Sequence, residues 1–483
     1  MALESLQPQN LWKHFENICN IPHPSGHEAQ VAEYIKNFAK ENNLDCEQDE
    51  LGNVIIEKKA APGCENKGTI ILQSHMDMVP LASQGSDHDF VKDKIKTIID
   101  GDFVRADNTT LGADDGIGVA TALALLENPD LKCGPLRAIF TVEEETTMKG
   151  ATYIDKKYLE GDYLINLDSE ETYNLYVGCQ GSADIILDFN VQKIEADNCR
   201  AIKLNASGFK GGHSGADIHR GRANAACTMA AVLNDLSDDF DFFIQDFSSG
   251  RLRNAISSRA SIKVLVPQES ADAFVKGASL AFERYQRIYK DTDPDMTLEC
   301  CETQSSSVTA LSYTDSLSLL SLILSLPLGA LRMSSVDSSV TETSNNLGIV
   351  QCYDDKVSIY CMCRSLNDDS LDAIIARIDG ICSQYDNVDF SVDNRHACWL
   401  SPDKNALIDS LKANFMEVTS CPLKVTVMAA GLECAMFAQK ASDSLQLVSI
   451  GALVIGAHTP QEKVKIADVN SIYQTVLKTL NTI

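Results

Sequence analysis

Several short apolar runs in this sequence end in a histidine or in acidic residues. Residues 69–72 form one of these runs, and Gln73-Ser74-His75-Met76-Asp77 follows it directly. The same arrangement recurs after residues 137–142, 163–167 and 445–455. Runs of this length fit buried strands, and segments rich in Ala and Leu lie between them. This alternation predicts an α/β fold with a mostly parallel central sheet that helices cover on both faces.

The middle of the chain follows a different pattern. From about Ser182 to about His396 the strand-like segments alternate apolar and polar residues, which is typical of sheets with one solvated face. The α/β pattern then returns and continues to the end of the chain. At 483 residues the chain is also longer than one hydrophobic core usually serves. We therefore expect one domain formed by residues 1–182 and 397–483, interrupted by an inserted α+β domain of residues 183–396.

Residues 25–28 carry a start signal for a helix. Ser25-Gly26-His27-Glu28 has the form of a capping box, with Ser25 as the N-cap and Glu28 at the third helical position. The helix that follows is expected to end near Asn42 and to bury Val31, Ile35 and Phe38.

Composition and charge exclude several classes of partner. The chain has 68 acidic and 41 basic residues, a net charge of −27, which disfavours binding to nucleic acid and to anionic membranes. The most apolar window, residues 317–326, is too short to span a bilayer and predicts a buried helix. No secretory signal follows Met1. The 16 cysteines lack C-x-x-C spacing, so we expect reduced thiols, a cytoplasmic location and no cysteine-based zinc site.

The polar residues that follow the apolar runs share a chemistry. Such residues meet beyond the carboxyl ends of strands in an open parallel sheet. Imidazole and carboxylate are zinc ligands, so two histidines with several carboxylates suit a hydrolytic site with two metal ions. Asp77 is well placed to orient the ring of His75. The full set is His75, Asp77, Asp114, Asp115, Glu143, Glu144, Glu145, Asp168, Glu170 and His458.

Each of these residues has a simpler explanation when taken alone. His75 is equally compatible with a hydrogen-bonded histidine at a strand end, and Asp114 with the N-cap of the Ala-rich helix that follows it. Residues 143–145 resemble a solvated charge run, and His458, before Thr459-Pro460, is typical of a turn. The joint pattern, rather than any single residue, favours the metal site.

Eight motifs spread over the chain carry a resemblance to a known family. They lie at residues 21–25, 72–80, 110–114, 168–171, 210–215, 252–256, 431–434 and 448–451. With these motifs the chain is similar, over essentially its full length, to the M20 metallopeptidases, and within them to the aminoacyl-histidine dipeptidases of the peptidase D type. The resemblance implies a zinc-peptidase catalytic domain with a lid domain inserted into it.

The resemblance also implies two zinc ions in each subunit, although Mn²⁺ and Co²⁺ suit the same ligands. The implied ligands are His75, Asp114 and Asp168 for one ion, and Asp114, Glu145 and His458 for the other. Asp114 would bridge ions about 3.5–4 Å apart. Asp77 would orient His75, Glu144 would be the general base, and the peptide bond between Asp114 and Asp115 would be cis.

Further roles fall on residues that would contact a substrate. The resemblance implies that His213 stabilises the oxyanion, that Asn254 and Arg364 bind a terminal carboxylate, and that Glu433 also contacts the substrate. Without the resemblance, His213 is as compatible with a turn histidine, and Arg364 with a surface ion pair. The inserted domain would close over the metals and carry the contacts of a homodimer.

The expected activity is hydrolysis of unblocked dipeptides, Xaa-His among them, including β-alanyl-histidine (carnosine). The alternatives are another M20 amidohydrolase, such as a tripeptidase or an N-acyl amino acid deacylase, and a non-catalytic peptide-binding homologue. The chain departs from the family pattern at three positions. Ala429 stands where a histidine is expected, Asp115 where an asparagine is expected, and Glu143 where a threonine is expected. None is an implied ligand, and Ala429 leaves the finer substrate preference open.

Overall fold

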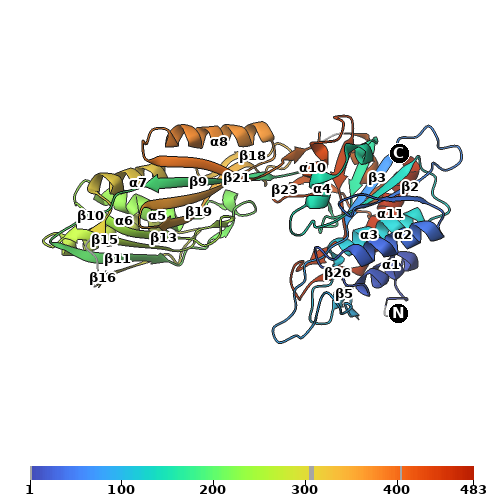
Figure 1. The fold of residues 1–483 in the computed structure, drawn as a ribbon, viewed down its shortest axis with the longest axis horizontal. Helices are drawn as coiled ribbons and strands as arrows, with labels where there is room; N and C mark the ends of the chain where they lie inside the picture. Colours follow the sequence, from blue (N-terminus) through green and yellow to red (C-terminus); the bar gives the residue numbers. More distant parts are fainter. Residues whose placement is uncertain (1–2, 304–308, 403–404) are drawn as a thin grey trace. The chain divides into compact units, whose positions relative to one another are not determined.

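The structure is a computed structural model, and it describes residues 3–303, 309–402 and 405–483. The chain forms two compact units (Figure 1). Unit 1 consists of Met1–Cys179, Trp399–Val427 and Leu432–Ile483, and unit 2 consists of Gln180–Cys398 and Met428–Gly431. Unit 1 is therefore discontinuous in sequence, because the two segments of unit 2 interrupt it.

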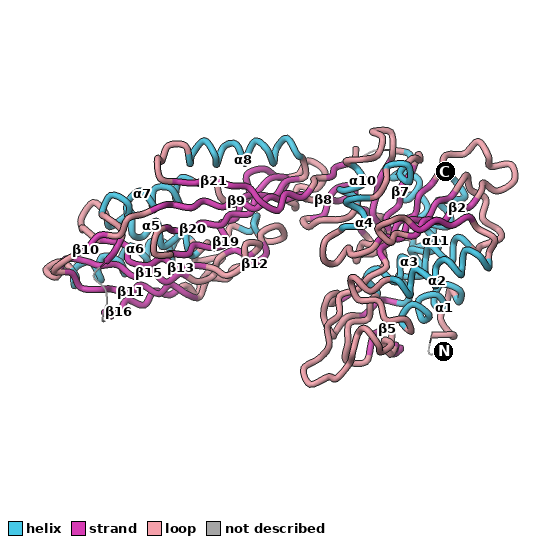
Figure 2. Tube along the Cα trace, in the orientation of Figure 1, coloured by secondary structure: helices cyan, strands magenta, loops and turns pink. Residues whose placement is uncertain are grey.

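A nine-stranded sheet forms the centre of unit 1 (Figures 1 and 2). Its order is β1-β2-β6-β3-β7-β24-β8-β22, with β23 paired to β8. The strands are β1 (Asp45–Gln48), β2 (Val54–Lys58), β3 (Ile70–His75), β6 (Leu136–Thr141), β7 (Tyr163–Asn166), β8 (Asn174–Cys179), β22 (Trp399–Leu400), β23 (Lys424–Met428) and β24 (Gln446–Ser449). The adjacent strands β6, β3, β7 and β24 are parallel, whereas β1–β2, β2–β6, β24–β8 and β8–β22 are antiparallel. The parallel centre confirms the predicted α/β class.

Helices pack against this sheet and against one another. They are α1 (Gln9–Cys19), α2 (Ala29–Glu41), α3 (Ala113–Leu126), α4 (Lys149–Tyr153), the 3-10 helix η1 (Lys156–Leu159), α9 (Ala406–Thr419), α10 (Cys434–Ala438) and α11 (Ile466–Thr482). Every residue of α3 from Asp115 to Leu126 is buried, because this helix itself carries small and apolar side chains on nearly all of its faces. Strand β3 is also buried along its whole length. The segment that ends at His75 and the helix that follows Asp114 therefore lie in the rigid centre of the unit.

The predicted capping box at the start of α2 is wrong. Neither side chain caps the helix. The Ser25 hydroxyl donates instead to Asp77 Oδ2 at 2.7 Å. Glu28 Oε1 accepts from the backbone N–H groups of Gly26 at 2.8 Å and Glu143 at 3.1 Å. Both side chains thus bind segments that are distant in sequence. The helix does bury the predicted residues Val31, Ile35 and Phe38.

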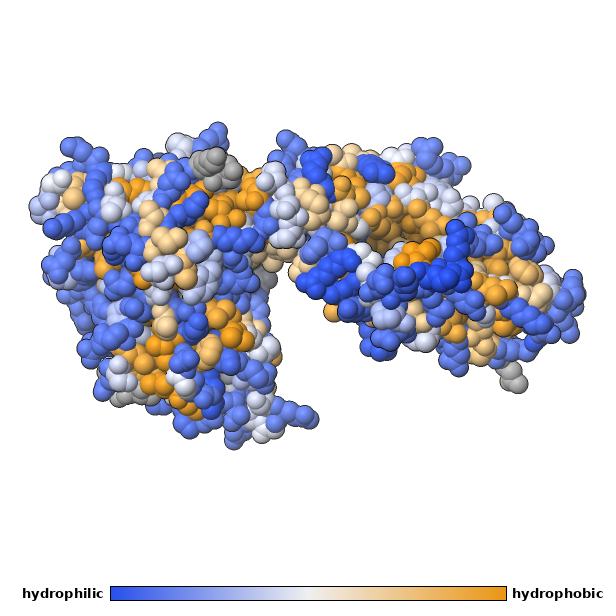
Figure 3. Space-filling view, turned by 180° about the vertical axis from the view of Figure 1, so that it is seen from behind, coloured by the Kyte–Doolittle hydropathy of each residue, from blue (hydrophilic) through white to orange (hydrophobic). Residues whose placement is uncertain are grey.

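A small four-stranded sheet completes unit 1. Its order is β25 (Val454–Ile455), β26 (Lys463–Lys465), β5 (Phe103–Ala106) and β4 (Thr97–Asp100). Figure 3 shows hydrophobic residues gathered on the lower part of unit 1, the part in which Figure 1 places β5 and β26. The exposed apolar side chains of these strands are Ile99 and Ile455. The connection between β25 and β26 contains His458, so this sheet positions one of the predicted ligands.

Unit 2 is built on a single antiparallel sheet (Figure 2). Its order is β16-β11-β15-β13-β19-β20-β9-β21, with β18 paired to β19. The strands are β9 (Gly181–Asn190), β11 (Cys199–Ser207), β13 (Phe243–Ser249), β15 (Ala260–Pro267), β16 (Thr297–Thr303), β18 (Gly329–Met333), β19 (Thr341–Cys352), β20 (Lys356–Ser365) and β21 (Val388–His396). Two short pairs lie outside it, β10 (Ile194–Glu195) with β17 (Thr309–Ala310) and β12 (Gly212–His213) with β14 (Ala255–Ile256).

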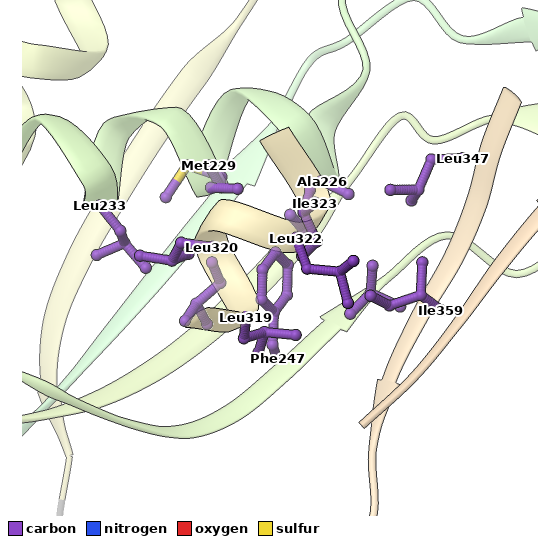
Figure 4. Packing of buried hydrophobic residues seen from close by; sticks show 14 of the residues in the cluster. Ala226, Met229, Leu233, Phe247, Leu319, Leu320, Leu322, Ile323, Leu347 and Ile359 are labelled. Carbon is purple, nitrogen blue, oxygen red and sulfur yellow. The ribbon is translucent and has the colours of Figure 1, made fainter. Parts of the chain in front are cut away.

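Four helices bury one face of this sheet in a common core, part of which Figure 4 shows. They are α5 (Ala225–Leu236), α6 (Ala271–Ile288), α7 (Tyr313–Ser325) and α8 (Asp368–Cys382), and the unit also has the 3-10 helix η2 (Ile218–Arg220). Alternate residues of β11, Ile202 and Leu204, point into the core. Helix α7 covers most of the apolar window that predicted a buried helix, which confirms that prediction. In the part of the chain that the structure describes, no helix combines the length and the apolar character needed to cross a membrane.

Two leucines of α7 allow a matched test of this core. Leu322 is 0 % exposed and Leu324 is 40 % exposed. We expect Leu322→Ala to destabilise unit 2 by about 2–5 kcal/mol through the cavity that it leaves, and Leu324→Ala to cost much less. Both tryptophans, Trp12 and Trp399, belong to unit 1. In urea unfolding, Leu322→Ala should therefore shift the circular dichroism transition more than the tryptophan fluorescence transition. Equal effects of the two substitutions would contradict the assignment of Leu322 to the core and of Leu324 to the surface.

Candidate metal centre

The predicted ligands come from separate elements of unit 1 and meet at one edge of its sheet. His75 is the last residue of β3, Glu145 follows β6, and Asp168 follows β7. These three strands are adjacent and parallel, so their carboxyl ends lie together. Asp114 lies in the first turn of α3, and His458 lies between β25 and β26. The sheet, a helix start and a loop therefore each contribute to one cluster.

The distances within this cluster form two groups of three residues. His75 Nε2 lies 3.1 Å from Asp114 Oδ1 and 3.3 Å from Asp168 Oδ1. His458 Nε2 lies 3.1 Å from Asp114 Oδ2 and 2.9 Å from the Glu145 carboxylate. Ligands bound to a tetrahedral ion at about 2.0–2.1 Å are about 3.3–3.4 Å apart. The residues present therefore fit a pair of divalent metal ions.

A third group of candidate ligand atoms joins His75 to Glu144 and Glu145. It shares His75 with the first group and Glu145 with the second. Glu144 thus lies close to one residue of each group.

Asp114 faces a histidine with each of its carboxylate oxygens, one from each group. The helix behind it is capped by its neighbour, since Asp115 Oδ1 accepts from the Gly118 N–H at 3.0 Å. The simpler explanation of Asp114 as a side-chain N-cap therefore does not describe its environment. The peptide bond between Asp114 and Asp115 is cis, as predicted.

Asp77 lies outside both groups and binds His75 from behind. His75 Nδ1 lies 3.0 Å from the Asp77 carbonyl oxygen and 3.4 Å from Oδ1. A proton on Nδ1 satisfies these acceptors and leaves the Nε2 lone pair free for a metal ion. The carboxylate also accepts from the backbone N–H groups of Glu144 at 3.0 Å and Glu145 at 3.2 Å. Asp77 thus holds two segments that carry candidate site residues.

Two further carboxylates support the site without facing the ligand cluster. Glu28 accepts from the Glu143 N–H, next to the two amides that Asp77 holds. Glu462 accepts from the amides of residues 111–113, just before Asp114. Neither role was predicted, because no local pattern signals a carboxylate that binds backbone more than a hundred residues away.

Glu144 and His458 are among the site residues whose pKa values are strongly shifted. Burial raises the pKa of Glu144 well above its ordinary value, and the nearby carboxylates of Glu433 and Glu145 raise it further, against the charge of His75. A carboxyl group with a raised pKa is better suited to accept and return a proton. Hydrogen bonds to Asp114 and Glu145 raise the pKa of His458 to about 11. A metal ion must therefore displace a proton from this ring.

Glu433 is buried beneath the site, where it binds the central strands. Its side chain is 0 % exposed, and Oε2 accepts from Gln73 Nε2 at 2.5 Å and from the Thr141 hydroxyl at 2.8 Å. Gln73 Oε1 in turn accepts from Asn166 Nδ2 at 2.6 Å, and Asn166 Oδ1 accepts from the Ser449 hydroxyl at 2.5 Å. This buried chain of hydrogen bonds joins β6, β3, β7 and β24 beneath the site. Glu433 thus supports the strands beneath the site, and its expected contact with a substrate stays a prediction.

The other expected substrate residues belong to unit 2, where Ser214 links them. The Ser214 N–H donates to the Asn254 carbonyl at 2.9 Å, and Arg364 Nε donates to the Ser214 hydroxyl at 3.2 Å. His213 precedes Ser214 in the short strand β12, which pairs with β14 just after Asn254. Three residues separated by up to 151 positions thus meet around one serine.

The hydrogen bonds of His213 define its tautomer. Nδ1 accepts from the backbone N–H groups of Gly215 at 3.2 Å and Ala216 at 3.1 Å. Burial and the charge of Arg364 lower the pKa of His213, which favours the neutral ring. The single proton then lies on Nε2, and this atom is free to donate.

Arg364 is a buried cation, 9 % exposed, without a paired carboxylate among residues 3–303, 309–402 and 405–483. The nearby carboxylate of Asp184 already binds Arg253 at 2.6 Å. A buried guanidinium normally has an anionic partner. Its environment therefore suits an anion supplied from outside the chain, rather than the surface ion pair that was the alternative.

Comparison with known proteins agrees with the geometry of the site. Residues 71–482 match the model of Peptidase family M20/M25/M40. The chain therefore belongs to this family of peptidases, as the sequence motifs predicted. It is 35 % identical over 480 residues to the cytosol non-specific dipeptidase of Escherichia coli (strain K12), covering 99 % of this chain and 98 % of that protein.

Solved structures give the same result. The crystal structure of aminoacylhistidine dipeptidase from Vibrio alginolyticus is similar with a TM-score of 0.95 and 33 % identity, covering 100 % of this chain and 98 % of that chain. The aminopeptidase PepT from Bacillus cereus ATCC 10987 is similar with a TM-score of 0.57 and 15 % identity, over 99 % of this chain and 98 % of that chain. The second likeness is one of fold alone.

Proposed function

We propose that this M20 peptidase is a dipeptidase that acts through two divalent metal ions, with zinc as the expected ion. The observation that carries the proposal is the position of Asp114, whose two oxygens each face the imidazole of a different three-residue group. A carboxylate in this position suits a bridge between two ions. Glu145 and His458 would complete one set of ligands, and His75 and Asp168 the other.

The proposed mechanism uses the groups around this bridge. Bound divalent ions lower the pKa of a water molecule and polarise a carbonyl oxygen. Glu144 accepts the proton of the attacking water and returns it to the leaving amine, which its raised pKa favours. His213 donates from Nε2 to the oxyanion of the tetrahedral intermediate. Asp77 keeps the His75 ring and the backbone of Glu144 in place.

The proposed substrates are dipeptides with a free carboxylate, Xaa-His and β-alanyl-histidine among them. The buried guanidinium of Arg364, which has no paired carboxylate in the described part of the chain, supports this choice, and Ser214 links it to Asn254. The names of the Escherichia coli and Vibrio alginolyticus relatives point in the same direction. We also propose a cytoplasmic location, as the name of the Escherichia coli protein indicates for that relative. A homodimer is proposed as well, and light scattering coupled to size-exclusion chromatography tests it.

A substrate panel tests the activity. We expect metal-loaded protein to hydrolyse Ala-His and β-Ala-His, to lose this activity with a chelator and to regain it with Zn²⁺, Mn²⁺ or Co²⁺. A tripeptide and an N-acetyl amino acid complete the panel. Turnover of the acylated compound alone would replace the dipeptidase by a deacylase, and turnover of the tripeptide alone would indicate a tripeptidase. No turnover of any compound would favour a peptide-binding homologue.

Asp77→Asn tests the orienting carboxylate. The asparagine keeps the size of the side chain but presents an N–H₂ group to backbone donors of residues 144 and 145. We expect kcat/KM to fall by about 10–100-fold, as for other residues that orient metal ligands. Asp162→Asn is the matched control, because Asp162 binds the Thr69 N–H at the opposite end of β3. Equal losses in the two variants would show that Asp77 has no special role.

A further inference from the structure

Glu462 binds the segment that leads into Asp114 with both of its carboxylate oxygens. Oε2 accepts from the N–H groups of Leu111 at 2.8 Å and Gly112 at 3.2 Å. Oε1 accepts from Ala113 at 2.7 Å and approaches the Asp114 N–H at 3.5 Å. The Glu462 side chain is 2 % exposed. Consecutive backbone donors thus converge on one buried carboxylate.

The backbone of this segment is shaped for such an anion. Gly112 has φ 72° and ψ 31°, a left-handed conformation that favours glycine. This turn directs neighbouring N–H groups to one side and forms a concave anion-binding nest. A Cβ atom at position 112 would also lie 3.0 Å from Met78 Sδ. Conformation and packing therefore both favour a glycine here.

Glu462 lies in the same turn as His458. The turn is closed by hydrogen bonds from the Thr459 N–H to the Gly456 carbonyl at 3.2 Å and from the Glu462 N–H to the Thr459 carbonyl at 3.0 Å. One end of this turn places the His458 ring 3.1 Å from Asp114 Oδ2. The other end holds the backbone of Asp114 through Glu462. The turn thus fixes both residues relative to each other.

We infer that Glu462 is a positioning residue, which sets the place of Asp114 between the two ligand groups before a metal ion binds. The inference rests on the proposed metal site, where Asp114 is the shared ligand. Among the residues that the structure describes, the Glu462 carboxylate has hydrogen bonds to the backbone of residues 111–114, and none to the side chain of a candidate ligand. Its effect on metal affinity would arise from the backbone that it holds, since a preorganised site loses less entropy when it binds an ion.

Glu462→Gln is the principal test. The amide keeps the shape of the side chain but turns an N–H₂ group toward one set of backbone donors, and the negative charge is lost. In metal-free protein we expect hydrogen exchange at residues 111–113 to accelerate about ten-fold or more. We expect zinc affinity, measured by competition with a chromophoric chelator, to fall by about 10–100-fold. Glu462→Asp, which keeps the charge on a shorter side chain, should lie between Glu462→Gln and the native protein.

Glu16→Gln is the matched control. Glu16 is also a buried carboxylate that binds a backbone N–H in unit 1, that of Leu3 at 3.2 Å, but it holds the N-terminal segment. We expect its zinc affinity to stay within two-fold of the native protein, whatever its loss of thermal stability. A purely structural role for Glu462 predicts that both variants lose affinity only in proportion to stability.

Two further results separate the inference from the proposed function. Unchanged exchange at residues 111–113, or accelerated exchange with unchanged zinc affinity, in Glu462→Gln would overturn the positioning role. Failure of the native protein to bind zinc would instead refute the proposed metal site. The hydrogen-exchange data would still test whether Glu462 holds the backbone of residues 111–113. If Glu462→Gln does not fold, Glu462→Asp and Gly112→Ala are measured in the same way. Both must lose zinc affinity for the inference to stand.

Discussion

Replacing Glu144 with alanine will lower kcat/KM for Ala-His by about 10²–10⁴-fold, the usual contribution of a general base. The loss should be chemical rather than structural. The backbone of residue 144 is held by Asp77, which accepts its N–H at 3.0 Å whatever the side chain is. Neither of the two main ligand groups contains the Glu144 carboxylate. Bound metal should therefore remain.

The measurement combines steady-state kinetics with metal analysis of the purified variant. Glu143→Gln is the matched control, because this neighbouring carboxylate binds Lys149 at 3.0 Å and belongs to neither ligand group. An ion pair of this partly exposed kind contributes little, so the control should retain nearly native turnover. Activity of Glu144→Ala within ten-fold of the native protein, at full metal content, would exclude Glu144 as the base.

Replacing Asp114 with alanine should abolish the stabilisation that metal ions give to the protein. The site brings several carboxylates close together, and their charges repel one another without a cation. Zinc at 100 times its dissociation constant should stabilise the native protein by about 2.7 kcal/mol. That gain corresponds to a rise in Tm of about 3–5 °C. Asp114→Ala removes the shared ligand of both groups, so we expect little or no rise and activity near background.

Differential scanning fluorimetry with and without zinc checks this expectation. Asp155→Ala is the control, because Asp155 caps η1 at a distance from the site and its loss should leave the zinc-dependent rise intact. Zinc affinity of the native protein should increase with pH, because the proton on His458, whose pKa is raised to about 11, competes with the ion. A zinc-dependent rise in Asp114→Ala equal to that of the native protein would refute the bridging role.

Local sequence patterns were sufficient to predict the site residues that lie at the end of a strand. His75 and Asp168 lie at the ends of buried apolar runs, and parallel neighbours bring such ends together. The class of the fold followed from the same runs. Similar reasoning failed at Ser25 and Glu28, whose spacing matches a capping box. Their partners are Asp77 and the backbone of Glu143, 52 and 115 residues away, and local spacing holds no information on such contacts.

The sequence could predict the roles of the carboxylates only in part. By itself, the sequence determined the α/β class, the parallel centre and the residue types that gather at its edge, because strand periodicity and strand ends are local properties. Only the tertiary structure decided which carboxylates face the imidazoles, as Asp114 does, and which bind backbone, as Glu462 does across about 350 residues. The physical reason is that a carboxylate binds a histidine, a metal ion or an amide N–H equally well, so its neighbours in space assign its role.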